Sequence, residues 1–181
     1  KLGTGVQKCA RPIYLRGAIL RGPAARPLDS VAVEQVAFRM RVAAQSDSAI
    51  AAQVADLERA FARVRSGAAA DSELVLGATA HYWRDLFLRR PLDALRRLPV
   101  PVLVLQGGKD YQVTRADFER VQAALGGKSP GQALTIWLPD LNHLFMAVAG
   151  ESTGAEYGRL GHVDPQVVTQ ITRWIQRAAA R

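Results

Sequence analysis

The stretch that decides the fold is Pro-Val-Leu-Val-Leu-Gln-Gly-Gly-Lys-Asp, at residues 101–110. Its apolar run is as long as a β-strand and has no polar alternation, which is typical of a parallel strand covered on both faces. The run breaks into a Gly-Gly turn that ends at Asp110. A second run, Ala-Leu-Thr-Ile-Trp-Leu at 133–138, breaks in the same way and leads through Pro-Asp-Leu-Asn to His143. The sequence therefore predicts two buried strands, each followed by a polar side chain.

The two polar side chains suggest chemistry. The carboxyl edge of an open α/β sheet is where such folds bind ligands and place catalytic groups. An aspartate and a histidine at that edge can form the orienting and proton-transferring parts of a triad. The alternatives are structural, with Asp110 as a turn former that bonds its own backbone and His143 as a histidine hydrogen-bonded in a loop. The letters Gly-x-Ser-x-Gly occur at 127–131 and 150–154, but neither segment directly follows a predicted strand and opens a helix, as a nucleophile elbow does. No Gly-x-Cys-x-Gly occurs, so the nucleophile that the pair would serve is expected to be absent.

Helical periodicity fills most of the remaining sequence. A short apolar stretch from Tyr14 to Leu20 predicts one more strand before the helices begin. Strand, helix, strand and helix at these lengths predict right-handed parallel crossovers and an α/β fold. We expect six helices. The first is capped by Asp29 or Ser30, the second spans 50–64 and ends at Gly67, the third spans 78–90 and ends at Pro91, and the fourth covers 92–98. The fifth begins at Thr114 with a capping box to Asp117, and the last follows Asp164-Pro165.

Composition argues against several classes of protein. The net charge of +8 comes mainly from residues 1–28, which hold six Lys or Arg and no acid. The sequence has no basic stripe of the kind that would predict nucleic-acid binding. No apolar run approaches the roughly 20 residues of a membrane span. Cys9 is the single cysteine, which excludes a disulfide framework, and it lacks the Gly-flanked turn of a nucleophile. Three scattered histidines without paired cysteines predict no metal site, and we expect no cofactor. The sequence does not decide the cellular compartment, with the cytoplasm slightly favoured.

A family resemblance rests on five segments that occur in order. The chain resembles the C-terminal half of an α/β-hydrolase, in the branch of dienelactone-hydrolase-like and acyl-peptidase-like serine esterases. The resemblance implies a parallel sheet with flanking helices and a helical cap insertion, and it makes Asp110 the triad acid and His143 the general base. The segments are Ala-Arg-Pro-Leu (25–28), His-Tyr-Trp (81–83), Leu-Gln-Gly-Gly-Lys-Asp-Tyr-Gln-Val (105–113), Leu-Asn-His-Leu-Phe (141–145) and Gly-His-Val-Asp (161–164).

The resemblance also divides the chain and suggests a substrate site. It implies that residues 1–28 and 91–181 form part of the hydrolase core and that 29–90 form the helical cap. Tyr82 and Trp83 are then candidate substrate-binding residues, with packing inside the cap as the alternative. The substrate would be a small ester or an acyl-peptide.

What the resemblance leaves out is the first half of the hydrolase. The segments that would supply the oxyanion-hole loop and the serine elbow are not in the sequence, although Lys-Leu-Gly-Thr-Gly at 1–5 resembles the tail of an elbow with Lys1 in the serine position. We therefore expect the chain alone to be inactive and to need the missing N-terminal half or self-association as a dimer. The alternative is a truncated non-catalytic module that associates through an exposed sheet edge.

Overall fold

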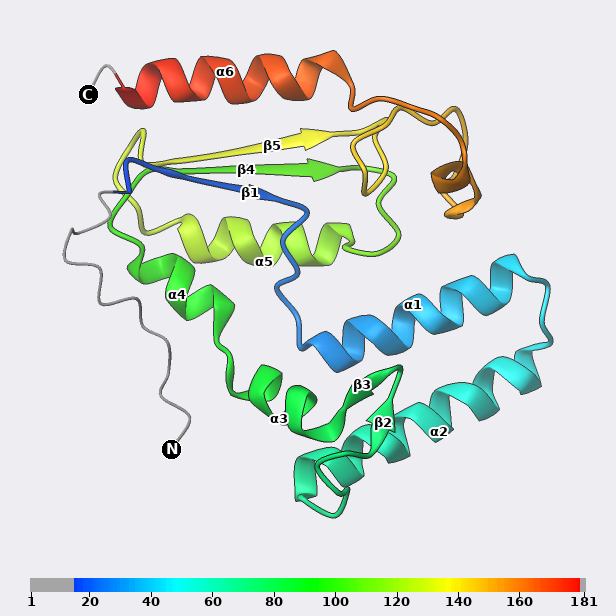
Figure 1. Cartoon of the computed structure of the whole chain (residues 1–181). Coiled ribbons are helices and arrows are strands. Elements are labelled where there is room, and N and C mark those ends of the chain that lie inside the picture. The colour runs from blue at the N-terminus through cyan, green and yellow to red at the C-terminus, as the bar shows by residue number, and fades with distance from the viewer. Residues whose placement is uncertain (1–14, 180–181) are drawn as a thin grey trace.

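The computed structural model describes residues 15–179, so the expectations on Lys1, Cys9 and Tyr14 lie outside the described residues. Three parallel strands form the main sheet in the order β1-β4-β5, as Figure 1 shows, and a two-stranded antiparallel hairpin forms a second sheet. The elements are β1 (Ala18–Arg21), α1 (Leu28–Val42), α2 (Asp47–Ser66), β2 (Leu74–Val75), β3 (Ala78–Thr79), α3 (Ala80–Leu88), α4 (Pro91–Arg97), β4 (Val102–Gly107), α5 (Arg115–Leu125), β5 (Ala133–Leu138), the 3₁₀ helix η1 (Ala155–Gly158) and α6 (Pro165–Ala179).

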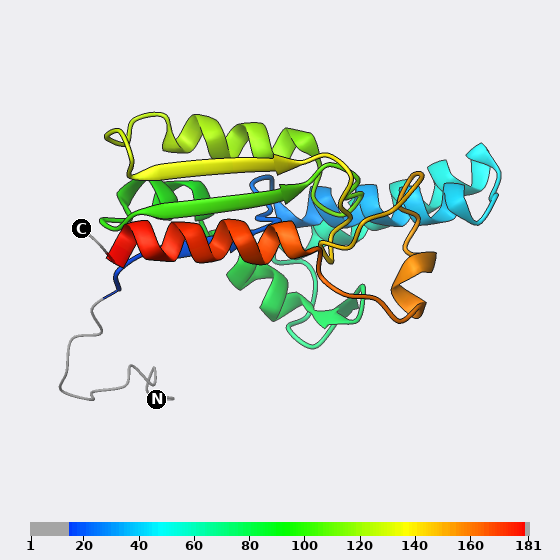
Figure 2. The same ribbon diagram turned by 90° about the horizontal axis from the view of Figure 1, so that it is seen from above.

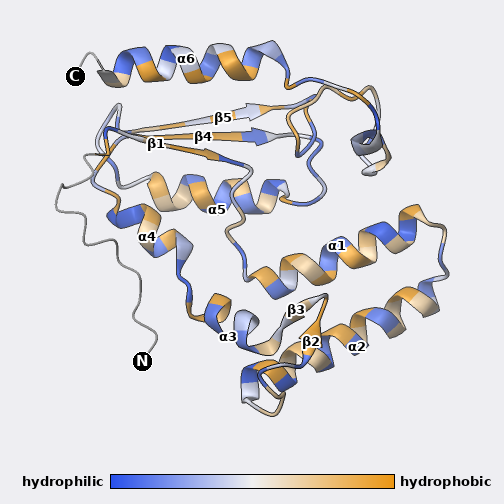
Figure 3. Cartoon of the chain, viewed as in Figure 1, coloured by the Kyte–Doolittle hydropathy of each residue, from blue (hydrophilic) through white to orange (hydrophobic). Residues whose placement is uncertain are grey.

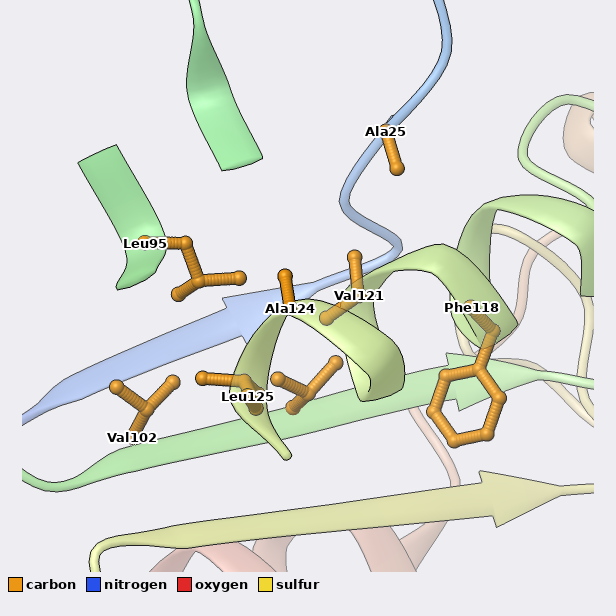
Figure 4. Packing of buried hydrophobic residues seen from close by; sticks show 8 residues of the cluster. Ala25, Leu95, Val102, Phe118, Val121, Ala124 and Leu125 are labelled. Atoms are coloured by element: carbon orange, nitrogen blue, oxygen red, sulfur yellow. The ribbon is translucent and has the colours of Figure 1, made fainter. Parts of the chain in front are cut away.

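The central strand β4 is covered on both faces, as its unbroken apolar sequence predicts. All six of its residues are buried. Side chains alternate between the faces of a strand, so Val102 and Val104 meet α4 and α5 while Leu103 and Leu105 meet α6. Figure 4 shows the first of these two cores, and Figure 2 shows the sheet between α5 and α6. The result is a three-layer α/β arrangement.

The outer edge of β1 is open among residues 15–179. The strand is paired with β4 only. The backbone N–H groups of Ala18 and Gly22 donate to β4-side carbonyls at 2.9 Å each, so those of the alternate residues Ile19 and Arg21 point away from the sheet. Figure 3 shows that this edge strand is largely apolar.

Residues 29–90 build a helical layer with a core of its own. One buried cluster contains Phe61, Val64 and Trp83, and every residue packed against it also comes from this segment. The ring of Phe61 meets that of Trp83 edge to face, with centroids 4.8 Å apart. The α2 pattern is confirmed, because Ile50, Leu57, Phe61 and Val64 are buried and Gly67 ends the helix at φ 79°. No helix of the described residues is long and apolar enough to cross a membrane.

Two expectations on this layer were wrong. Neither Asp29 nor Ser30 caps α1, which begins at Leu28 after Pro27, and Asp29 is instead buried with its carboxylate bonded to Arg65. The expected helix at 78–90 is shorter, because residues 74–79 form the β2–β3 hairpin. Its turn puts Leu76 at φ 49° and Gly77 at φ 78°, a pair of left-handed residues that suits a two-residue hairpin.

Asp117 joins the segment after β1 to the start of α5. It completes the capping box with Thr114, as expected, but its buried carboxylate also accepts from the backbone N–H groups of Ala25 and Arg26 at 2.9 and 3.0 Å. The Arg26 guanidinium bonds the same carboxylate at 2.9–3.0 Å. Burial raises the pKa of Asp117, but these hydrogen bonds outweigh it and the net pKa lies below the ordinary value of 3.8. Asp117 therefore stabilises the fold in its ionised form.

Asp117→Ala is expected to cost about 3–5 kcal/mol of unfolding free energy, because it leaves the Arg26 guanidinium and three backbone N–H groups without their acceptor. The pKa of Asp117 is lower in the folded state, so its contribution is complete above pH 3.8 and is lost as the pH falls through the folded pKa. Urea unfolding at neutral and acidic pH measures both effects. Glu34→Ala is the matched control, since this second partner of Arg26 is 55% exposed and should cost less than about 1 kcal/mol. Equal losses in the two variants would contradict the prediction.

Candidate functional site

Asp110 and His143 meet beyond the carboxyl ends of β4 and β5. The Nδ1 atom of His143 lies 2.8 Å from Oδ2 of Asp110, within the range of 2.6–3.2 Å expected for a working acid–base pair. The carboxylate is fully buried, and the imidazole is 30% exposed. The two side chains are therefore within hydrogen-bonding distance, while their catalytic roles stay predictions.

The second oxygen of Asp110 shows that the turn interpretation is also true. Its Oδ1 atom accepts from the backbone N–H groups of Gln112 and Val113 at 2.8 and 2.9 Å. The aspartate therefore shapes its own loop with one oxygen and bonds His143 with the other. The two interpretations of this residue are not exclusive.

The hydrogen bonds around the pair set the protonation pattern of the imidazole. Oδ2 of Asp110 also accepts from the side-chain amide of Gln106 at 3.0 Å, so this oxygen is the acceptor in its contact with Gln106 and in its contact with His143. The proton of neutral His143 then lies on Nδ1, and Nε2 keeps a free lone pair. Within residues 15–179 no hydrogen bond reaches Nε2 of His143. This nitrogen can take a proton from a group on its exposed side.

Glycines let the two loops come close enough for this contact. A Cβ atom on Gly107 would lie 2.5 Å from the carbonyl oxygen of Leu141, and one on Gly108 would lie 2.5 Å from that of Pro139. The backbone N–H groups of Gly108 and Lys109 donate across the same gap at 2.7 and 2.9 Å. The Gly-Gly of the sequence is therefore required by the approach of the loop that carries Asp110 to the loop that carries His143.

A third segment reaches the pair through Gly22, directly after β1. Its φ is +52°, in the left-handed region that favours glycine. A Cβ atom there would be 3.4 Å from Oδ2 of Asp110 and from the ring of His143. Nothing in the sequence assigned Gly22 to the site, because its contact with the pair arises only from the position of β1 beside β4.

The loop of His143 is held by its neighbour Asn142, which is fully buried. Its Oδ1 atom accepts from the backbone N–H groups of Leu144 and Met146, at 3.0 Å each, and its Nδ2 atom donates to Glu156 at 3.1 Å. Burial raises the pKa of Glu156, but hydrogen bonds from Ser152, Asn142 and the backbone outweigh it and lower the net pKa. Asn142 is a second site residue that the sequence analysis did not assign.

An aromatic stack joins the helical layer to the site. Phe38 of α1 stacks on Tyr111 with ring centroids 4.5 Å apart, and Tyr111 stacks on Tyr157 at 6.3 Å. Gln35 of α1 adds a hydrogen bond of 3.0 Å to the carbonyl oxygen of Gln112. Burial, followed by the charge of Tyr157, raises the pKa of Tyr111. The contacts of α1 with the loop of Asp110 are thus both apolar and polar.

The two candidate substrate-binding residues lie apart from this pair. Trp83 is buried in the core of the helical layer, and its indole N–H donates to the carbonyl oxygen of Val75 at 2.8 Å. Tyr82 is 53% exposed on the same helix. Figures 1 and 2 both place α3 away from the carboxyl ends of β4 and β5. These positions favour the packing alternative for Trp83, and a role of either residue in substrate binding stays a prediction.

A cavity of about 610 Å³ is separate from the acid–base pair. It lies between the segment 24–28 and helices α3 and α4, and its lining includes Arg26, Arg65 and Arg90 but neither Asp110 nor His143. Residues 15–179 contain no group of three or more His, Cys, Asp or Glu placed to hold a metal ion.

Comparison with known proteins gives one informative similarity. The chain is 35% identical over 159 residues to Esterase EstD of Thermotoga maritima. The match covers 88% of this chain but 37% of the relative, so the chain spans little more than a third of the relative's length. No family model matches the chain. No solved structure matches it either.

Proposed function

We propose that this chain is the C-terminal part of a serine hydrolase with an α/β-hydrolase fold, in the dienelactone-hydrolase-like or acyl-peptidase-like branch, acting on small esters or acyl-peptides. The observation that carries the proposal is the contact of 2.8 Å between His143 Nδ1 and the buried Asp110 carboxylate, after two adjacent parallel strands. The similarity to a protein named an esterase, over 88% of the chain, points to the same chemistry.

The residues would act as the acid and base of a catalytic triad. Nε2 of His143 takes the proton of a serine hydroxyl as the serine oxygen attacks the substrate carbonyl, and the resulting imidazolium is stabilised by Asp110. His143 then returns the proton to the leaving alcohol or amine as the acyl–enzyme forms. Water repeats the cycle with His143 as base, which releases the acid and restores the serine.

The helical layer is proposed as the cap of this hydrolase, at residues 29–90, with 1–28 and 91–181 belonging to the core. Its separate buried cluster supports this division. The stack of Phe38 on Tyr111 supports a cap that contacts the core beside Asp110. A cap in this place would shape the space in front of His143 and so select the acyl group.

A fluorophosphonate probe tests the proposal, because it labels only an activated serine. The chain alone is expected to remain unlabelled, because neither of its Gly-x-Ser-x-Gly segments is a strand-to-helix elbow. Ser129 lies between α5 and β5, and Ser152 is buried and donates to Glu156. A longer polypeptide that contains this chain and supplies the elbow is expected to be labelled at one serine and to release acid from activated esters. Stoichiometric labelling of the chain alone, or no labelling of the longer polypeptide, would contradict the proposal.

The second candidate, a non-catalytic module that associates through a sheet edge, is favoured by the open edge of β1. Both candidates predict association at β1, but only the hydrolase predicts that the associated or longer polypeptide contains a reactive serine. The labelling experiment therefore separates them.

A further inference from the structure

Gln106 is the one polar side chain in the buried run of β4, and it is fully buried. By the alternation of the strand it lies on the α5 side, in line with Val102 and Val104. Its Nε2 atom lies 2.8 Å from the carbonyl oxygen of Val113, 3.0 Å from Oδ2 of Asp110 and 3.2 Å from the carbonyl oxygen of Gly107. Three acceptors therefore face one amide nitrogen.

These acceptors fix the orientation of the amide. A flipped Gln106 would place its carbonyl oxygen against Asp110 Oδ2 and the Val113 carbonyl, which would set acceptors against acceptors. In the orientation that satisfies them, Oε1 of Gln106 has no hydrogen-bond partner among residues 15–179. A buried, unpaired amide oxygen is unfavourable, so core stability alone gives no reason for a glutamine here.

The position of Asp110 gives a reason. Four donors surround its carboxylate, two backbone N–H groups on Oδ1 and the side chains of Gln106 and His143 on Oδ2. The backbone donors lie two and three residues further along the same loop and move with it. Gln106 instead belongs to the β4 strand, which is hydrogen-bonded to β1 and β5 on its two sides.

We propose that Gln106 is a positioning residue for Asp110, holding Oδ2 from within the sheet so that its remaining lone pair points at Nδ1 of His143. The contact to Val113 at 2.8 Å closes the same loop at its far end, so one amide holds both the carboxylate and the loop that carries it. The role of Asp110 as a catalytic acid rests on the proposed function. The orienting contact itself does not.

The test reads the proton of His143 directly. In protein labelled with ¹⁵N-histidine, the Nδ1–H of His143 should give a low-field proton resonance that exchanges slowly with water; His143→Gln assigns it among the three histidines of the chain. Gln106→Met keeps the size and apolar stem but removes the donor. We expect this variant to lose the resonance or to speed its exchange about tenfold or more, because Asp110 loses its fixed orientation.

Gln122→Met is the matched control. The Gln122 amide makes an exposed hydrogen bond of 3.0 Å to Thr135, away from Asp110, so the substitution should leave the His143 resonance unchanged. Gln106→Met that unfolds at the same urea concentration as the parent and keeps the resonance with unchanged exchange would overturn the proposal.

If Gln106→Met does not fold, a second measurement tests the same contact from the side of Asp110. In Asp110→Asn, the side-chain N–H₂ resonances of Gln106 should shift, because one acceptor has changed. Asp93→Asn is the control, since the Asp93 side chain on α4 is 44% exposed and the substitution should leave the resonances in place. Gln106 resonances that do not respond to Asp110→Asn would overturn the proposal as well.

Activity separates this inference from the proposed function. In an ester-hydrolysing protein that contains this chain, Gln106→Met is expected to lower kcat about tenfold or more with little change in KM. An unchanged kcat would overturn the positioning role. If the protein hydrolyses no ester while the resonance of His143 still depends on Gln106, the proposed function fails and the orienting contact stands.

Discussion

Replacing His143 with alanine is expected to lower kcat for an activated ester by about 10⁴-fold or more, in a protein that carries this chain and supplies the serine. The reason is the removal of the group that we propose takes the serine proton, since Nδ1 of His143 bonds Asp110 and leaves Nε2 to act as the base. KM should change little, because the imidazole acts on the serine rather than holding the substrate. Steady-state rates with p-nitrophenyl esters measure both constants.

Two further variants make this result specific. His162→Ala removes an exposed histidine of the same loop region and should leave kcat unchanged. Asp110→Asn should reduce kcat by a similar factor of about 10⁴, because an amide can present its N–H₂ to Nδ1 and favour the wrong tautomer. A His143→Ala protein that keeps a tenth of the parental kcat would refute the assignment of the base.

The pairing of Asp110 with His143 could be predicted because it follows from topology. Two apolar runs of strand length predict adjacent parallel strands, and parallel strands bring their carboxyl ends to one edge. Any side chains placed directly after those ends then become neighbours. The contact of 2.8 Å is the local outcome of that rule, helped by a Gly-Gly that lets the loops approach.

The residues that orient the pair could not be predicted in the same way. Gln106 ends a run of Val and Leu, where a polar residue reads as the end of a strand, and its contact to Asp110 depends on how the following loop folds back. Asn142 gives no periodic signal, because its partners are two nearby backbone N–H groups and a glutamate fourteen residues away. Sequence patterns report which face is buried but not which buried amide meets which acceptor.

Asp117 shows the limit of a motif that was correctly identified. The capping box with Thr114 follows from sequence spacing alone. The hydrogen bonds to Ala25 and Arg26 join positions more than ninety residues apart and arise only when β1 lies beside β4. The same carboxylate therefore has a local role that the sequence predicts and a long-range role that the sequence does not predict.

In dilute solution the chain is expected to associate, with a mass of at least twice the 19.6 kDa of one chain. The outward N–H groups of Ile19 and Arg21 form a short template for a further strand, since β1 is paired on one side only. Leu15 is 53% exposed just before the strand, and Ile19 and Leu20 are only partly buried. An added strand, from a second copy or from a longer polypeptide, would cover both the backbone and the apolar side chains.

Arg21→Pro and Arg21→Ala separate the role of the backbone from that of the side chain. Both remove an exposed arginine, but only proline removes the outward N–H, and neither affects the bond of Gly22 to Leu105. In a symmetric dimer joined at β1, proline removes two hydrogen bonds of about 0.5–1.5 kcal/mol each, so association should weaken roughly tenfold or more. Arg21→Ala should associate like the parent.

Light scattering after size exclusion measures the mass, and hydrogen exchange at residues 18–21 locates the contact. If β1 is the contact, the amides of Ile19 and Arg21 should be protected in the associated species and should exchange faster in Arg21→Pro. In a chain whose β1 edge is already covered from within, the outward amides would be protected at every concentration. A cooperatively unfolding species with the mass of one chain and full protection at β1 would therefore show that the fold is complete by itself, and would remove the physical reason to expect a further strand.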